Sequence, residues 1–215
     1  MARKHTIDLL AEAADLVDRA ESLEESQDEL VEKLEEEFGG FEDVPQKYVD
    51  TYDQFEAERT NAMGNAVALV LQVLDWDGGI EDHEAMEGHD SVRERIESDG
   101  VPVGAAPSEV VVTSLTTGQL ASIQDRVAEA SFDYDVESGD AEGTPKSGFG
   151  MVETLREAIV SQPPGAPTRT ENRNEVPDPA EYDHQVGMYL YDKVDDMSTS
   201  GEGDLGNSSL RERMS

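Results

Sequence analysis

The sequence predicts a mainly helical α+β protein, with an N-terminal helical hairpin followed by a small domain of one or two strands and three helices. Three observations support this prediction. Leucine recurs every seven residues near the N-terminus, a second apolar stripe with the same period follows it, and one β-branched run opens the second half of the chain. A seven-residue period is typical of helices that pack along one face, whereas β-branched runs favour strands.

The first predicted helix carries a leucine at one core position in each of four heptads: Leu9, Leu16, Leu23 and Leu30. The partner core positions of the same heptads hold Thr6, Ala13, Ala20, Gln27 and Leu34. Small Ala and polar Gln make a weak parallel dimer, but they leave room for a bulky residue of an antiparallel helix. Gly39-Gly40 is expected to end the helix, because glycine adopts the left-handed cap conformation without penalty.

A second helix is predicted to begin near Val44-Pro45 and to end at Trp76, because proline is tolerated in the first helical turn. Its buried stripe also has a seven-residue period and consists of Tyr48, Tyr52, Phe55, Arg59, Ala62, Ala66, Leu69, Val73 and Trp76. Two such helices joined by a short glycine-containing link form an αα-hairpin. The apolar stripes pair either within the chain or between chains, and the hairpin offers a surface for another helix or subunit.

Changes in composition divide the chain into four parts. Residues 1–76 form the hairpin, and residues 77–108 lose the period, gain Gly, Pro and acidic residues, and read as an acidic linker with one short helix around Ser91 to Ile96. Residues 109–197 form the small α+β domain. Residues 198–215 are rich in Gly and Ser and are expected to be a flexible tail.

The small domain is predicted to open on a strand over Glu109–Thr113, a β-branched run between Pro107 and Ser114. A lone strand needs a pairing partner. The candidates are the run Phe132–Val136, in which apolar and acidic residues alternate, and a second copy of the chain.

Three helices are predicted to follow this strand. Thr116 and Gln119 have the spacing of a capping box, in which each side chain satisfies a backbone N–H group of the first turn. A second helix is expected over Met151 to Ser161, and the four prolines of residues 163–177 predict a loop after it. The last helix begins after Pro179 and carries the apolar face Tyr182, Val186, Tyr189, Leu190, Lys193, Val194 and Met197.

Charge is the strongest compositional signal. The 215 residues include 16 Lys and Arg against 50 Asp and Glu, which gives a formal net charge of −34. Such a chain is expected to bind neither nucleic acid nor an anionic membrane, because phosphate binding requires clustered basic residues. Regularly spaced apolar residues between the acids favour a folded protein adapted to high salt over a disordered one. An acidic mimic of nucleic acid is the alternative.

Sequence motifs for catalysis or metal binding are missing. The chain has no cysteine, and its four histidines form no HExxH pattern. The glycine-rich and nucleophile motifs of dinucleotide, nucleotide and hydrolase sites do not occur either. We therefore expect a non-enzymatic protein without a cofactor or a metal ion. No apolar run reaches 18 residues, so we expect a soluble protein of the cytoplasm.

Three segments together resemble a known family. They are the strand Glu109–Thr113, the element Ser114-Leu115-Thr116-Thr117-Gly118-Gln119-Leu120 that opens a helix, and Tyr189-Leu190-Tyr191-Asp192-Lys193-Val194 near the end. This layout resembles the tail-assembly chaperones of tailed viruses, and the acidity points to a virus or provirus of a halophilic archaeon. The resemblance implies a non-catalytic protein that coats the tape-measure protein and recruits tail-tube subunits in the host cytoplasm.

Apolar faces on residues 48–74, 120–130 and 182–197 are the expected partner surfaces, since a helix binds in a groove through i, i+3 and i+4 anchors. The candidate contacts are Tyr52, Phe55, Leu120, Ile123, Tyr189 and Leu190. Ordinary core packing is the alternative for each of them. Two other classes stay open: a virion structural protein such as a head or tail connector, and a cellular helical adaptor. A homo-oligomer is also possible.

Overall fold

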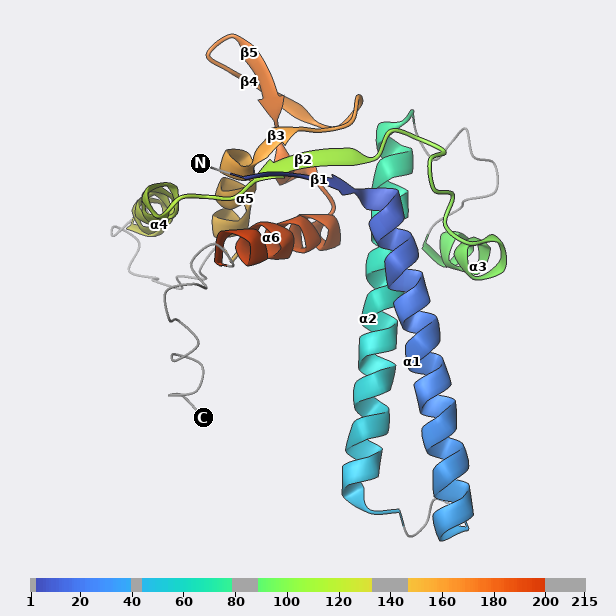
Figure 1. Cartoon of the computed structure of the whole chain (residues 1–215). Helices are drawn as coiled ribbons and strands as arrows, with labels where there is room; N and C mark the ends of the chain where they lie inside the picture. The colour runs from blue at the N-terminus through green and yellow to red at the C-terminus, as the bar shows by residue number, and fades with distance from the viewer. Residues whose placement is uncertain (1–2, 40–43, 79–88, 133–146, 200–215) are drawn as a thin grey trace, which may run out of the picture. The chain divides into compact units, whose positions relative to one another are not determined.

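The computed structural model describes residues 3–39, 44–78, 89–132 and 147–199 (Figure 1). Two compact units divide the chain. The helical unit is Asp8–Ser108, and the sheet unit combines Met1–Ile7 with Glu109–Ser215. Six α-helices and five strands in the described residues confirm a mainly helical fold with some β-structure. None of the described helices is long and apolar enough to cross a membrane.

The predicted hairpin is present as α1 (Leu9–Phe38) and α2 (Gln46–Trp76) (Figure 1). The Asp8 side chain caps α1, because its Oδ1 accepts hydrogen bonds from the backbone N–H groups of Leu10 at 3.1 Å and Ala11 at 3.3 Å. Gly39 ends α1 in the left-handed region at φ 70°, and its N–H donates to the carbonyl of Glu35. The predicted C-terminal ends of both helices, at Gly39 and Trp76, are therefore confirmed.

Burial along α1 follows the partner positions of the heptads. Ala13, Ala20, Gln27 and Leu34 are buried, while Leu16, Leu23 and Leu30 are only half-buried. Small residues bring the two helices close together, which pushes the larger leucines to the sides of the contact. Two ion pairs flank it, from Arg19 to Glu58 at 2.9 Å and from Arg59 to Glu24 at 3.0 Å.

The prediction that Thr6 occupies the first core position of the helical heptads is wrong. Residue 6 is exposed and lies in strand β1 (Lys4–Asp8), and α1 begins only at Leu9. The physical reason is the Asp8 cap, which starts the helix three residues after Thr6.

Gln27 is a polar residue buried between α1 and α2, and its substitution tests how much this buried amide contributes to stability. Only 5% of Gln27 is exposed, and its Nε2 donates to the Tyr52 carbonyl at 3.4 Å. Gln27→Met keeps the length of the side chain and removes a buried amide, so the free energy of unfolding should rise by about 1 kcal/mol. Urea unfolding followed by Trp76 fluorescence measures it, and Gln54→Met at an exposed site is the control. A lower stability of Gln27→Met would show that the amide hydrogen bond outweighs the apolar gain.

The expected acidic linker contains α3 (His89–Asp99), which packs into the helical unit. Val92 is fully buried and Ile96 is 3% exposed.

The two ends of the helical unit are adjacent, since Ser108 Oγ donates to Asp8 Oδ1 at 2.6 Å and the Leu9 N–H donates to the Ser108 carbonyl at 3.0 Å. The helical unit is therefore an insertion between β1 and the strand that follows Ser108.

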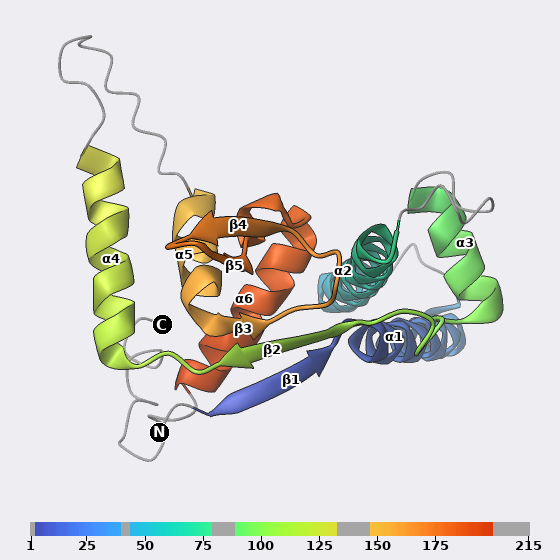
Figure 2. The same cartoon turned by 90° about the horizontal axis from the view of Figure 1, so that it is seen from above.

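A three-stranded sheet lies in the order β1, β2 (Glu109–Thr113) and β3 (Ile159–Ser161) (Figure 2). β2 confirms the predicted strand. β3 runs antiparallel to it, with Val111 opposite Ser161 and Val112 opposite Ile159. The helix expected to reach Ser161 ends at Ala158, and its last three residues form β3 instead. Residues 133–136 of the candidate strand Phe132–Val136 lie outside the described residues, and Phe132 ends a helix.

Three helices belong to the sheet unit: α4 (Thr117–Phe132), α5 (Ser147–Ala158) and α6 (His184–Thr199). The capping box of α4 is confirmed, since the Thr116 N–H donates to Gln119 Oε1 at 3.0 Å and the Gln119 N–H donates to Thr116 Oγ1 at 3.3 Å. The core contains fully buried Val110, Val112, Leu155, Val186, Leu190 and Val194.

The loop expected over residues 163–177 is in part a β-hairpin, which corrects the prediction. β4 (Thr168–Glu171) pairs antiparallel with β5 (Asn174–Pro177). Asn172 and Arg173 connect the strands with φ values of 50° and 70°, and two central residues with positive φ are typical of the type I′ turns that match strand twist. The prolines lie before β4 or at the end of β5, where they break no strand pairing.

Tyr182, between a 3₁₀ turn (Pro179–Glu181) and α6, holds the residues before β4 in place. Its hydroxyl donates to Gln162 Oε1, and Gln162 Nε2 donates to the carbonyls of Ala166 at 3.0 Å and Pro167 at 2.8 Å. Burial, together with the negative charge of Asp178, raises the pKa of Tyr182 well above its ordinary value.

This raised pKa predicts a loss of stability in alkali. Above about pH 10 the unfolded chain releases the Tyr182 proton while the folded chain keeps it, so unfolding becomes easier by up to about 1.4 kcal/mol per pH unit. Tyr182→Phe should be less stable than wild type near neutral pH, and this difference should shrink as the pH rises. Urea unfolding between about pH 9 and 11 measures it. Tyr52→Phe, at an exposed position, should keep the wild-type dependence; a parallel dependence in Tyr182→Phe would contradict the prediction.

Candidate functional site

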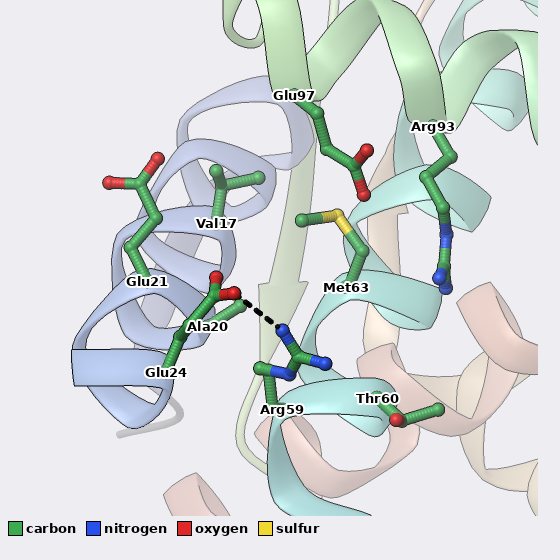
Figure 3. A pocket seen from close by; sticks show the side chains of 9 residues that line it. All are labelled: Val17, Ala20, Glu21, Glu24, Arg59, Thr60, Met63, Arg93 and Glu97. Atoms are coloured by element: carbon green, nitrogen blue, oxygen red, sulfur yellow. Dashed lines mark ion pairs between the residues drawn. The ribbon is translucent and has the colours of Figure 1, made fainter. Parts of the chain in front are cut away.

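A cavity of about 460 Å³ lies in the helical unit between α1, α2 and α3 (Figure 3). Val17, Ala20 and Met63 supply apolar walls. The side chains of Arg93 and Glu97 extend from α3 on two sides of Met63. The Glu24–Arg59 ion pair lines another side of the cavity. The rim also includes Glu21 and Thr60.

The chemistry of this cavity is mixed. Three carboxylates and two guanidinium groups line it, and one of each is already committed to the Glu24–Arg59 pair. Within residues 3–39, 44–78, 89–132 and 147–199, no group of three or more His, Asp or Glu side chains is placed to hold a metal ion. A small cavity with apolar walls and a charged rim can accept one long side chain of a partner, whose stem packs on Met63.

A sharper feature is the unequal burial of α2. Ten residues from Ala62 to Trp76 are buried, whereas none from Gln46 to Asn61 is. In the N-terminal half of α2, Tyr52 is 36% exposed and Val49 is 39% exposed. We call the residues Val49, Tyr52 and Phe55 of α2, together with Leu23 and Leu30 of α1, the hairpin strip.

Aromatic packing orders the end of the hairpin beyond this strip. The rings of Phe38 and Tyr48 lie 6.1 Å apart with an interplanar angle of 57°, and the Lys47 ammonium lies 4.5 Å from the centre of the Tyr48 ring. Edge-tilted aromatic pairs and cation–π contacts stabilise exposed helix ends by modest amounts. The hairpin therefore presents its strip on two helices whose far ends are fastened together.

The six predicted contact residues have different environments. Tyr52 and Phe55 lie on one face of α2 and form part of the hairpin strip, with Tyr52 exposed and Phe55 half-buried. Leu120 on α4 and Tyr189 on α6 are half-buried. Ile123 is 5% exposed and Leu190 is fully buried, so both are packed inside the sheet unit. The structure thus brings together Tyr52 and Phe55, which belong to the helical unit; the other four belong to the sheet unit.

Two structural features that involve arginine were not predicted from the sequence. One is the cavity wall from α3, for which the spacing of Val92 and Ile96 at i and i+4 was an available signal. The other is an ion-pair network in the sheet unit. There Arg156 contacts Glu153 at 2.8 Å and Asp178 at 3.1 Å, and Arg126 contacts Glu153 at 2.9 Å.

The network raises the pKa of Arg156. Burial by itself lowers the pKa of Arg156, but the hydrogen bonds and charges of Glu153 and Asp178 outweigh it and raise the pKa above the ordinary value. No periodic sequence pattern predicts such a network, because its members come from α4, α5 and the residue after β5.

Comparisons with protein-family models, curated proteins and solved structures found no match to this chain.

Proposed function

We propose that this chain is a non-catalytic interaction protein that binds a helical partner through the hairpin strip. The observation that supports the proposal is the absence of any buried residue between Gln46 and Asn61, although the same helix is buried on most sides from Ala62 onward. Two helices alone bury only the faces they share, so a third helix along the strip would complete the packing.

The charge around the strip favours a basic partner. Residues 21–38 of α1 contain nine Asp or Glu and one lysine. A partner helix with apolar anchors at i, i+3 and i+7 and with Lys or Arg beside them would match both the strip and its acidic border.

The family resemblance suggests a particular partner. In that form of the proposal, the protein is a tail-assembly chaperone in the host cytoplasm, and the hairpin strip binds the tape-measure protein and helps recruit tail-tube subunits. The faces of α4 and α6 that carry Leu120 and Tyr189 would be secondary contacts. A structural role in the virion and a cellular adaptor role are the competing outcomes.

Adaptation to high salt is part of the proposal and gives a prediction. Raising KCl from about 0.1 to 1 M shortens the Debye length from about 10 to 3 Å and screens the repulsion among the acidic residues. The midpoint of thermal unfolding, followed by circular dichroism, is therefore expected to rise across this range. A midpoint independent of KCl would contradict adaptation to high salt.

The binding test uses variants that leave the fold intact. Val49→Ser/Tyr52→Ser removes two exposed apolar side chains from the strip, and Val160→Ser/Met188→Ser removes two side chains of 45% and 41% exposure from the sheet unit. Tagged wild type and both double variants are used to capture partners from native host or infected cells in 1 M KCl, where charge effects are largely screened. Mass spectrometry then identifies the partners and the content of purified particles.

The outcomes separate the candidate functions. Capture of a long helical tape-measure protein, lost only in the strip variant, with this chain missing from mature particles, supports the chaperone. Abundance in particles identifies a structural protein, and purely cellular partners identify an adaptor. Equal capture by wild type and the strip variant would refute the hairpin strip as the binding surface.

A further inference from the structure

β1 lies at the edge of the sheet, with β2 on one side and no described strand on the other (Figure 2). The Ser114 N–H donates to the Arg3 carbonyl at 3.1 Å, and the Leu9 N–H donates to the Ser108 carbonyl at 3.0 Å, so β1 and β2 are antiparallel. Backbone groups alternate in such a pair. Arg3, His5 and Ile7 therefore direct their N–H and C=O groups toward β2, as Leu9 directs its N–H, and the intervening residues of β1 face the open edge.

The open edge belongs to Lys4, Thr6 and Asp8. Residues 3–6 are exposed, while the side chain of Ile7 is buried against the core of the sheet unit. Neither Arg3 nor Lys4 forms an ion pair with any described residue, although the chain contains 50 acids. The opposite edge differs, because β3 is only three residues long and β5 lies beside it.

The order of residues in β1 is complementary to itself. When two copies of Lys4–Asp8 run antiparallel about Thr6, Lys4 of each copy lies opposite Asp8 of the other. The hydrogen bonds that Asp8 accepts from Leu10, Ala11 and Ser108 end on Oδ1, so among the described residues Oδ2 is left for the lysine ammonium. A parallel arrangement would instead place Lys4 beside Lys4 and Asp8 beside Asp8, which is unfavourable.

We propose that the open edge of β1 is an interface with a second copy of this chain, paired antiparallel about Thr6 so that two three-stranded sheets become continuous. The two Thr6 residues exchange backbone hydrogen bonds, and the Asp8 N–H donates to the Lys4 carbonyl of the second copy. Such an interface is isologous and closes at two copies. A strand of five residues buries less area than the roughly 1,200 Å² of stable interfaces, so the dimer exchanges rapidly with monomer.

Single cysteines test the register, because the natural chain has none. In the proposed pairing, the Cα atoms of residue 6 in the two copies are about 5.5 Å apart, which a disulfide spans. The Cα atoms of residue 4 are about 14 Å apart, since four residues of strand separate them. In 1 M KCl under mild oxidation, Thr6→Cys should form a disulfide-linked dimer, whereas Lys4→Cys should form no more than a control, Thr168→Cys on exposed β4. Equal linking of Thr6→Cys and Lys4→Cys, or no linking of Thr6→Cys, would overturn the proposal.

A second measurement does not depend on a covalent link. Lys4→Glu places a carboxylate opposite Asp8 of the second copy and changes an exposed side chain that forms no ion pair with a described residue. Sedimentation equilibrium at about 0.3 M KCl, where exposed charges are only partly screened, should show concentration-dependent association of the wild type and loss of that association in Lys4→Glu, with unchanged circular dichroism. Lys4→Arg should retain it. Association that is the same in Lys4→Glu as in the wild type, or a wild type that remains monomeric at every concentration, would refute the Lys4–Asp8 pairing.

Discussion

Leu190→Ala is expected to lower the free energy of unfolding of the sheet unit by about 3 to 5 kcal/mol. Leu190 is fully buried on α6, among the fully buried core residues of this unit. Removing three carbons from a packed interior forfeits the transfer free energy of the side chain and leaves a cavity. Native-state hydrogen exchange of the Val110 and Val112 amides measures the change, because β2 lies at the centre of the sheet.

A matched substitution on the same helix separates packing from partner binding. Met188 is 41% exposed, so Met188→Ala should change stability by no more than about 0.5 kcal/mol. A Leu190→Ala variant as stable as Met188→Ala would contradict a core role and return Leu190 to the candidate contacts. The expected large loss would instead assign the apolar face of α6 at this position to the interior of the sheet unit.

Arg156→Met is expected to destabilise the sheet unit by about 2 to 4 kcal/mol. The substitution keeps an unbranched apolar stem but removes the cation between Glu153 and Asp178, whose side chains are only 12% and 17% exposed. Asp178 then loses its ion-pair partner among the described residues, Glu153 keeps only Arg126, and the loss of one partner costs more than the pair contributes. Urea unfolding monitored by circular dichroism, combined with hydrogen exchange in β2, measures the loss.

The neighbouring arginine provides the control for this network. The Arg126 side chain is 37% exposed, so Arg126→Met should cost about 1 kcal/mol or less. The Arg156→Met deficit should also persist in 1 M KCl, because mobile ions screen exposed charges far better than shielded ones. Equal losses for the two variants, or a loss that vanishes in salt, would show that the network acts as an ordinary surface cluster.

Local signals predicted the long elements well. The ends of α1 and α2 follow from Gly39 and Pro45, and the start of α4 follows from the Thr116–Gln119 capping box. Each of these depends on residues within one helical turn, so the neighbouring sequence contains the whole interaction. The β2 strand was equally local, because its three consecutive valines favour an extended backbone.

Elements that depend on distant residues could not be predicted in the same way. Lys4–Asp8 reads as the lead-in to a heptad repeat, and it becomes a strand only by pairing with residues more than 100 positions later. The β4–β5 hairpin lacks the alternating apolar pattern of a strand, and the contacts of Tyr182 and Gln162 hold the residues before it.

The sequence could not show which of the candidate contact residues are exposed, because their burial also depends on distant residues. A seven-residue period identifies one face of a helix, but it does not say what covers that face. Tyr52 and Leu190 both lie on such faces; Tyr52 is exposed, and Leu190 is fully covered within its own unit. The sequence therefore ranked them equally, while the tertiary packing separates them.

The insertion of the helical unit between β1 and β2 means that the order of synthesis and the order of folding are reversed at the N-terminus. β1 leaves the ribosome before its partner β2, which begins at Glu109 and which a ribosome reaches about 5 to 20 s later. The contact of Ser108 with Asp8 can close the helical unit before any of the sheet exists. A chain released before residue 159 would contain the complete hairpin and no three-stranded sheet, so β1 is made before the hairpin but reaches its native neighbours after it.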